Sequence, residues 1–120
     1  MSSSVEDVGA VVDAFGAATG ARDVDAMMAM MTDDCIFEST SPPDGELAVG
    51  QAAVRAVWER LFADASDARF TAEERIVAGD RVIETWRYDW GGTEPGHVRG
   101  IDVFRVRAGK IAEKRSYVKG

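Results

Sequence analysis

The sequence contains only one cysteine and one histidine among its 120 residues. A single cysteine cannot form a disulfide within the chain, and the lack of disulfides is typical of reducing compartments, so we expect a cytoplasmic location. A zinc site built from cysteine and histidine needs several such residues, so we expect no metal. The chain also lacks a phosphate-binding loop, a dinucleotide fingerprint, a nucleophile elbow and a calcium loop, so we expect no cofactor.

Basic residues are also scarce, with 14 Lys and Arg against 21 Asp and Glu, which gives a net charge of −7. Nucleic acids and anionic membrane surfaces are bound by clustered Lys and Arg. No apolar run approaches the roughly 18 residues of a membrane span, and the N-terminal residues lack the basic and apolar regions of a signal peptide. We therefore expect neither nucleic acid nor membrane as a partner.

The chain does have the composition of a globular protein, with 46% apolar and 29% charged residues. This length predicts one domain that covers residues 1–120. Apolar residues at helical spacing predict three helices, which run from Ser4 to about Thr19, from Asp23 to Asp33–Asp34, and from Gly50 to about Ala65. The methionines of the second helix serve either as adaptable core packing or as the lining of a malleable ligand pocket.

A short strand is predicted at Cys35–Ser39, and after Asp67 the apolar residues recur with the period of two that is typical of strands. The further predicted strands are residues 70–77, residues 81–90 and two more between His97 and Gly120. Helices followed by a run of hairpin-linked strands differ from the alternating order of parallel folds. This order predicts an α+β fold, with an antiparallel sheet and helices packed on one of its faces.

The predicted strand 81–90 places large aromatic residues on one face. That face carries Val82, Glu84, Trp86, Tyr88 and Trp90. Aromatic residues in such a row either fill a core or form the wall of a cavity. Glu84 on the same face favours a cavity with polar groups in it.

An acidic residue lies in the middle of an apolar strand face near the end of the sequence. Asp102 shares this face with four uncharged residues, Val98, Gly100, Phe104 and Val106. Burying an acid costs free energy unless the acid is paired or used in chemistry, so Asp102 is the leading candidate for a functional residue. The only histidine, His97, falls on the opposite face of the same strand.

Three segments, residues 29–37, 50–55 and 100–111, carry a resemblance to a known family. The chain resembles the nuclear transport factor 2-like superfamily, in its SnoaL-like small-molecule branch. The resemblance implies a strongly curved sheet wrapped around helices, which makes a cone with one open cavity of ligand size. It also implies homodimers that form through the outer face of the sheet.

Ketosteroid isomerases of this superfamily place a protonated acid at the position of Asp102, where it donates to a developing oxyanion. Their oxyanion tyrosine falls on Phe15, and their general-base aspartate falls on Ser39, next to Glu38. Two catalytic groups are therefore missing, which argues against steroid isomerisation by that mechanism.

Epoxide hydrolases of this fold use two carboxylates bridged by an arginine. The Arg-Asp-Tyr near the end of that family resembles Arg115-Ser116-Tyr117, so one acid is missing here too. Polyketide cyclases of the SnoaL type work through a single pocket acid helped by polar neighbours. Asp102 meets that minimal requirement.

The turn at Ala108-Gly109 decides which residue faces Asp102 from the last strand. A two-residue turn places Arg115 there, whereas a three-residue loop with a bulge at Gly109 places Lys114 there and turns Ser116 inward. We favour the three-residue loop, because alanine is a poor residue before the glycine of a two-residue turn. Asp102 is then either half of a partly buried ion pair or an acid available for chemistry, and both alternatives stay open.

Two functions follow from these patterns. The first is a cofactor-independent enzyme that performs acid–base chemistry (isomerisation, cyclisation or hydrolysis) on an apolar, oxygen-bearing, polyketide- or terpenoid-like substrate in a hydrophobic cavity. The second is a ligand-binding or structural dimer without turnover, which a cavity filled by tryptophans and an Asp102 locked on Lys114 would favour. The catalytic candidates are Asp102, Glu38 and Glu84, and the ligand-binding candidates are Phe15, Phe37, Trp58, Trp86, Tyr88, Trp90, Phe104, Lys114 and Ser116.

Overall fold

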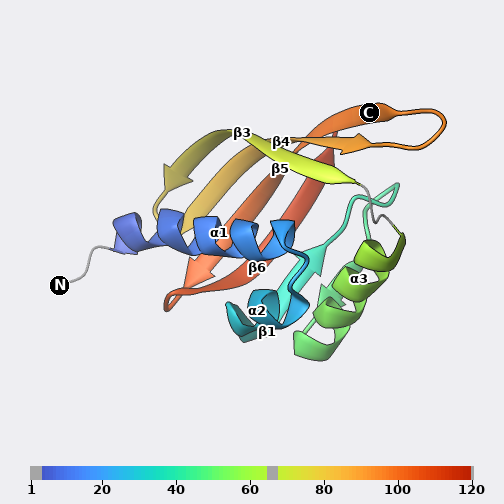
Figure 1. Ribbon diagram of the computed structural model, residues 1–120. Coiled ribbons are helices and arrows are strands. Elements are labelled where there is room, and N and C mark those ends of the chain that lie inside the picture. The colour runs from blue at the N-terminus through green and yellow to red at the C-terminus, as the bar shows by residue number, and fades with distance from the viewer. Residues whose placement is uncertain (1–3, 65–67, 120) are drawn as a thin grey trace.

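The computed structural model describes residues 4–64 and 68–119, with side chains from residue 8 onward. Helices α1 (Ser4–Gly20), α2 (Val24–Ala29) and α3 (Gln51–Asp64) lie against one side of a curved sheet (Figure 1). The strands of this sheet are β1 (Met31–Glu38), β2 (Leu47–Val49), β3 (Arg69–Ala78), β4 (Arg81–Trp90), β5 (Gly96–Arg107) and β6 (Lys110–Val118). The sheet curves around the helices without closing, which confirms the predicted cone-like α+β class.

The strand order in the described sheet is β2-β1-β6-β5-β4-β3. Every neighbouring pair is antiparallel except β1 and β6, which are parallel. The predicted antiparallel sheet is therefore confirmed except at this one parallel pair. The chain between β1 and β6 contains a helix and three long strands, and a connection of that length allows two neighbouring strands to run the same way.

The helices begin close to where the sequence predicts them, but α2 is shorter than expected. Its predicted N-cap is confirmed, because the side chain of Asp23 accepts a hydrogen bond from the backbone N–H of Ala26 at 3.1 Å. The helix ends at Ala29, and Met31 already pairs with Ile111 as the first residue of β1. The predicted end of the third helix at Ala65 lies outside the described residues. No helix in the described part of the chain is long and apolar enough to cross a membrane.

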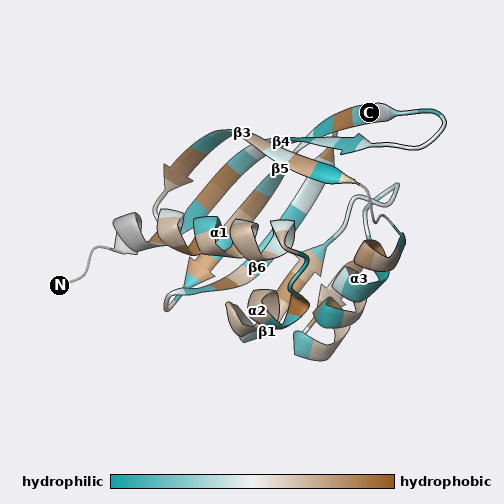
Figure 2. Cartoon of the chain, viewed as in Figure 1, coloured by the Kyte–Doolittle hydropathy of each residue, from teal (hydrophilic) through white to brown (hydrophobic). Residues whose placement is uncertain are grey.

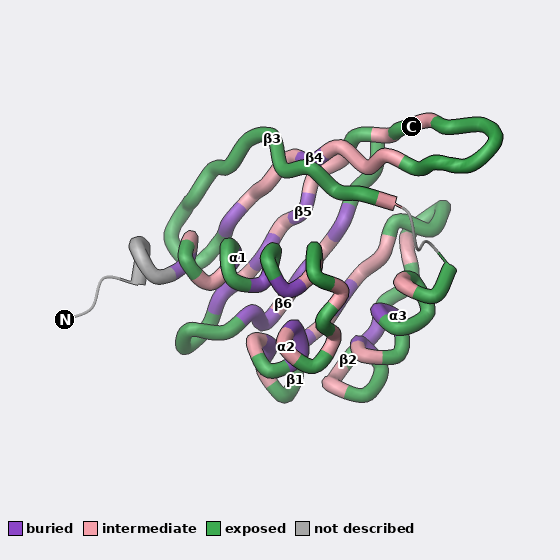
Figure 3. The backbone as a smooth tube through the Cα atoms, viewed as in Figure 1, coloured by how far each residue is buried: buried purple, intermediate pink, exposed green. Residues whose placement is uncertain are grey.

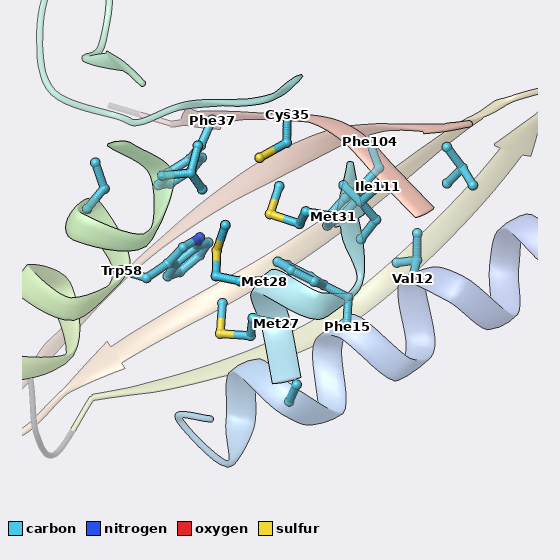
Figure 4. Close-up of a cluster of buried hydrophobic side chains, with 14 of the residues drawn as sticks. Val12, Phe15, Met27, Met28, Met31, Cys35, Phe37, Trp58, Phe104 and Ile111 are labelled. Atoms are coloured by element: carbon cyan, nitrogen blue, oxygen red, sulfur yellow. The ribbon is translucent and has the colours of Figure 1, made fainter. Parts of the chain in front are cut away.

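The hydrophobic core lies between the helices and the concave face of the sheet. Buried positions recur along the first part of β4, the second half of β5 and most of β6, whereas β3 at the sheet edge is exposed along its whole length (Figure 3). Apolar residues recur along the strands beneath α1 (Figure 2). Figure 4 shows the methionines of α2 between the ring of Trp58 on α3 and the ring of Phe15 on α1. The methionines therefore serve as core packing, the first of the two predicted roles.

Candidate functional site

Asp102 lies on the concave face of β5, in a row of polar residues that crosses the sheet. Glu84 on β4 and Ser116 on β6 are the residues paired with Asp102 on its two sides. Arg75 on β3 is in turn paired with Glu84. The fold thus gathers two carboxylates, a hydroxyl and a guanidinium in one line beneath the helices.

Asp102, Ser116 and Lys114 form a buried hydrogen-bonded group, which we call the Asp102 cluster. The hydroxyl of Ser116 donates to Oδ1 of Asp102 at 2.7 Å, and Nζ of Lys114 donates to Oγ of Ser116 at 2.9 Å. Nζ of Lys114 also lies 3.4 Å from Oδ2 of Asp102. Only 9%, 8% and 8% of Asp102, Lys114 and Ser116 is exposed to solvent. The cluster links an ammonium, a hydroxyl and a carboxylate, which is a path along which a proton can move.

The ammonium of Lys114 is surrounded by aromatic rings. Its Nζ lies 4.7 Å from the ring centroid of Phe37, 5.1 Å from that of Trp58 and 5.9 Å from that of Phe104. The electron-rich faces of such rings attract a cation and offset part of the cost of removing it from water. The rings therefore favour an ammonium in this position. The structure contains the contact between Lys114 and Asp102 that the ion-pair alternative requires.

The hairpin between β5 and β6 differs from both predicted registers. Arg107 pairs with Lys110 across a two-residue turn, in which Ala108 has a φ of 53° and Gly109 a φ of 75°. The preferred three-residue loop was therefore wrong. A register shift next to Val106 then adds one residue to β6, and Ser116 rather than Arg115 or Lys114 stands opposite Asp102. Lys114 and Ser116 still face inward, because residues two apart in a strand share a face.

Glu84 is also held in an ion pair. Arg75 contacts Glu84 at 2.9 Å and Asp13 on α1 at 2.5 Å, so it ties the helix to the sheet. The hydrogen bond from Arg75 lowers the pKa of Asp13, and the hydrogen bonds to Asp13 and Glu84 raise the pKa of Arg75. The structure therefore places Glu84 beside Asp102, in an ion pair with a residue that the sequence did not single out.

Glu38 is not brought together with Asp102. Its neighbour Phe37 points into the core, so Glu38 points to the outer face of the sheet. There it pairs with Arg115 at 3.2 Å. The predicted role of Glu38 as an assisting carboxylate does not fit this position.

The predicted aromatic residues form two groups. Phe15 joins the buried group next to Lys114, with its ring centroid 6.2 Å from that of Trp58 and 6.1 Å from that of Phe104. The other group follows the outer half of β4 and consists of Trp86, Tyr88 and Trp90, together with Phe70 of β3.

The sequence patterns did not predict that Phe70 belongs to this aromatic group. Phe70 is 55% exposed, and its ring contacts the rings of Trp86 and Tyr88. One feature of the sequence could have indicated this role, because Phe70 begins the predicted strand 70–77, which forms a hairpin with strand 81–90. Arg75 had no such signal, because a register shift between Ala72 and Glu74 changes which residues of β3 face inward.

Two surface hollows open on the described part of the sheet, and neither is lined by a residue of the Asp102 cluster. The larger has a volume of about 420 Å³ and is lined mostly by residues of the outer sheet face, among them Glu73, Thr85, Arg99 and Ile101. A second follows the irregular part of β3 next to Glu84. Neither of these two hollows is the central cavity that the resemblance implied, and the methionines and Trp58 belong to the packed core beneath the helices.

An open cone of helices and curved sheet, with a polar cluster on its concave face, defines a domain of the nuclear transport factor 2-like class. The sequence pattern of the SnoaL-like domain family matches residues 12–114, so the chain belongs to this family. No curated protein matches the chain.

Several solved structures are similar to this chain. An NTF2-like protein of unknown function from Mesorhizobium loti is 32% identical, with a TM-score of 0.85, and the match covers 100% of this chain and 97% of that one. An LEH-like epoxide hydrolase from M. tuberculosis is 18% identical, with a TM-score of 0.79 and coverage of 98% and 86%. TerC, crystallised with polyporic acid, is 16% identical, with a TM-score of 0.81 and coverage of 94% and 92%. At these low identities, the likeness to the epoxide hydrolase and to TerC shows a shared fold alone.

Proposed function

We propose that this chain binds a small, apolar, oxygen-bearing molecule against the concave face of its sheet and performs acid–base chemistry on it. The observation that supports this proposal is the Asp102 cluster, in which a carboxylate, a hydroxyl and an ammonium are hydrogen-bonded inside an aromatic surround. A buried polar group of this kind costs free energy, and such groups are common at functional sites. An epoxide hydrolase shares the fold, which supports small-molecule chemistry on this scaffold.

In this proposal Asp102 exchanges a proton with the substrate, and Ser116 connects it to the ammonium of Lys114. Glu84 is the assisting carboxylate, because it is the paired neighbour of Asp102 on β4. The substrate is polyketide- or terpenoid-like, and its reaction is an isomerisation, cyclisation or hydrolysis that needs no cofactor. Glu38 has no role in the proposal, since it lies on the other face of the sheet.

The second candidate function is a ligand-binding or structural module without turnover. It is favoured by the ion pair between Lys114 and Asp102 and by the packed interior, both of which restrict what Asp102 can do. The two candidates differ in one measurable property, which is whether the bound molecule is chemically changed.

We expect Asp102→Asn to abolish turnover and to leave the ligand bound. Native mass spectrometry of the purified protein identifies the co-purifying molecule, which then serves as substrate. Asparagine keeps the size of the side chain but cannot act as a base, so turnover should fall by at least about 100-fold. The matched control is Glu38→Gln, an equivalent change on the outer face, which should alter neither binding nor turnover. Unchanged turnover in Asp102→Asn would contradict the acid–base role, and a bound molecule that the wild type never converts would favour the second candidate.

We also propose that the chain forms a homodimer through the outer face of its sheet. This face carries exposed apolar side chains beside its ion pairs, among them Ile76, Leu47, Val49 and Tyr117. Ile76→Asp should convert the dimer to a monomer in sedimentation velocity, because a charge would be buried in the interface. Leu61→Asp, a matched change at a leucine of α3 that is 41% exposed, should leave the dimer intact. A wild-type protein that sediments as a monomer at micromolar concentration would contradict this proposal.

A cytoplasmic location and a single domain over residues 1–120 complete the proposal. The only cysteine, Cys35, is buried and free, and burial raises the pKa of its thiol, so it is poorly reactive. A free thiol at Cys35 is in keeping with a reducing compartment. Fractionation of the producing cells tests the proposed cytoplasmic location.

A further inference from the structure

The larger hollow on the outer face of the sheet lies between the end of β6 and the middle of β3. Its volume of about 420 Å³ is in the range of small-molecule pockets. From the β6 side to the β3 side, it is lined by Lys119, residues 99–101 of β5, residues 85–86 of β4, and Glu73 and Glu74 of β3. The hollow is therefore separate from the Asp102 cluster.

An irregularity in β3 brings two carboxylates to the same side of this hollow. In a regular strand, neighbouring residues point to opposite faces, so only one of Glu73 and Glu74 would line it. The pairing of β3 with β4 shifts by one residue between Ala72 and Glu74, which leaves Glu73 without a paired residue on β4. A bulge of this kind re-aims a side chain and is common beside functional sites. Both carboxylates therefore reach the hollow.

Two cations line the opposite side of the hollow, and one of them is paired. The guanidinium of Arg99 donates from Nε and Nη2 to the two carboxylate oxygens of Glu73, at 2.9 and 3.4 Å. Within the described residues, the ammonium of Lys119 and the carboxylate of Glu74 take part in no ion pair, and both residues are exposed. The hollow therefore offers one available positive group on one side and one available negative group on the other.

The floor between these charges is largely apolar. Ile101 and Trp86 line it, together with Thr85, which is paired with Ile101 across β4 and β5. An apolar group of a ligand can remove this surface from water. A ligand that carries only a negative charge would meet the carboxylate of Glu74, and one that carries only a positive charge would meet the ammonium of Lys119. A ligand with both charges satisfies both sides.

We infer that this hollow is a binding site for a free amino acid with an apolar side chain. The carboxylate of the amino acid accepts hydrogen bonds from Lys119 and from Nη1 of Arg99, which the pair with Glu73 does not use. Its ammonium donates to Glu74, and its side chain lies on Ile101. The site is independent of the chemistry proposed for the concave face.

Three matched probes test this inference. L-Phenylalanine, 3-phenylpropionate and 2-phenylethylamine share a phenyl ring on a two-carbon chain, and they carry both charges, the carboxylate alone and the ammonium alone. NMR titration of the ¹⁵N-labelled full chain gives the dissociation constant of each probe. We expect L-phenylalanine to bind roughly fivefold more tightly than either analogue, which is near the upper end for one exposed ion pair.

Two charge-removing variants assign each half of the ligand to its partner. Lys119→Met should weaken the binding of L-phenylalanine and 3-phenylpropionate roughly fivefold and leave that of 2-phenylethylamine unchanged. Glu74→Gln should weaken the binding of L-phenylalanine and 2-phenylethylamine and leave that of 3-phenylpropionate unchanged. Both positions are exposed, so the variants should stay folded. Lys110→Met and Glu94→Gln make the same changes at exposed positions outside the hollow and should alter none of the three affinities.

The hollow lies on the face that we propose for the dimer, so the titrations are repeated on Ile76→Asp, the expected monomer. The crossed losses of affinity in Lys119→Met and Glu74→Gln, found in either form, support the inference. Equal binding of the three probes, equal losses in the control variants, or no binding to either form overturns it. These outcomes leave the role proposed for Asp102 untouched, because that role is tested by turnover on the other face.

Discussion

Replacing Lys114 with methionine is expected to lower the free energy of unfolding by about 3–5 kcal/mol. Methionine has a similar length and removes the charge, so Asp102 stays buried opposite Ser116 without a cation. A buried charge that loses its partner keeps its desolvation cost and loses the attraction that offset it. Urea denaturation followed by tryptophan fluorescence measures the loss, and the slope of the transition shows whether the variant still unfolds in one step.

Two further variants test the origin of that loss. Lys110→Met makes the same substitution at the exposed hairpin turn and should change stability by less than about 0.5 kcal/mol. The double variant Lys114→Met/Asp102→Asn removes both charges and should recover most of the loss, because no unpaired charge remains. A double variant as unstable as Lys114→Met would show that packing against Phe37 and Trp58, rather than charge pairing, holds Lys114 in place.

Alternation alone predicts part of the Asp102 cluster, because Lys114 and Ser116 are two apart on a strand and share a face. That this face lies beside Asp102 was expected only from the three-residue loop, and the structure reaches the same arrangement through a two-residue turn and a register shift. The residue opposite Asp102 was not predictable. It depends on a left-handed φ at Ala108 and on one extra residue in β6, and sequence patterns specify neither.

The parallel pairing of β1 with β6 also had no local signal. Partners far apart in the sequence are chosen by the packing of the whole sheet, whereas the predicted hairpins join neighbours in sequence. The same limit applies to Arg75. Its contacts with Asp13 and Glu84 join three elements, and the irregular pairing of β3 turns it inward. The alternation of residues along a strand therefore predicts which side chains share a face of that strand. Only the assembled fold determines which charged side chains meet there.

Gly100→Ala is expected to lower the free energy of unfolding by about 2–3 kcal/mol, the cost of forcing extra atoms into a packed site. A Cβ at this position would lie 2.3 Å from the carbonyl oxygen of Tyr117 and 2.5 Å from Cζ2 of Trp86. The ring of Trp86 can turn away only by leaving its buried place, and the backbone of β6 cannot move without disturbing its pairing with β5. Thermal and urea unfolding give the loss, and the fluorescence of Trp86 should shift toward that of a more exposed indole.

The matched control for this variant is Gly16→Ala, because a Cβ at Gly16 meets nothing within 4 Å. Gly16 lies on the exposed side of α1, where alanine favours the helix over glycine by about 1 kcal/mol. The same substitution should therefore stabilise the chain at Gly16 and destabilise it at Gly100. If Gly100→Ala leaves stability unchanged, the indole of Trp86 is not held against β5. The inner end of the aromatic group on β3 and β4 would then be mobile.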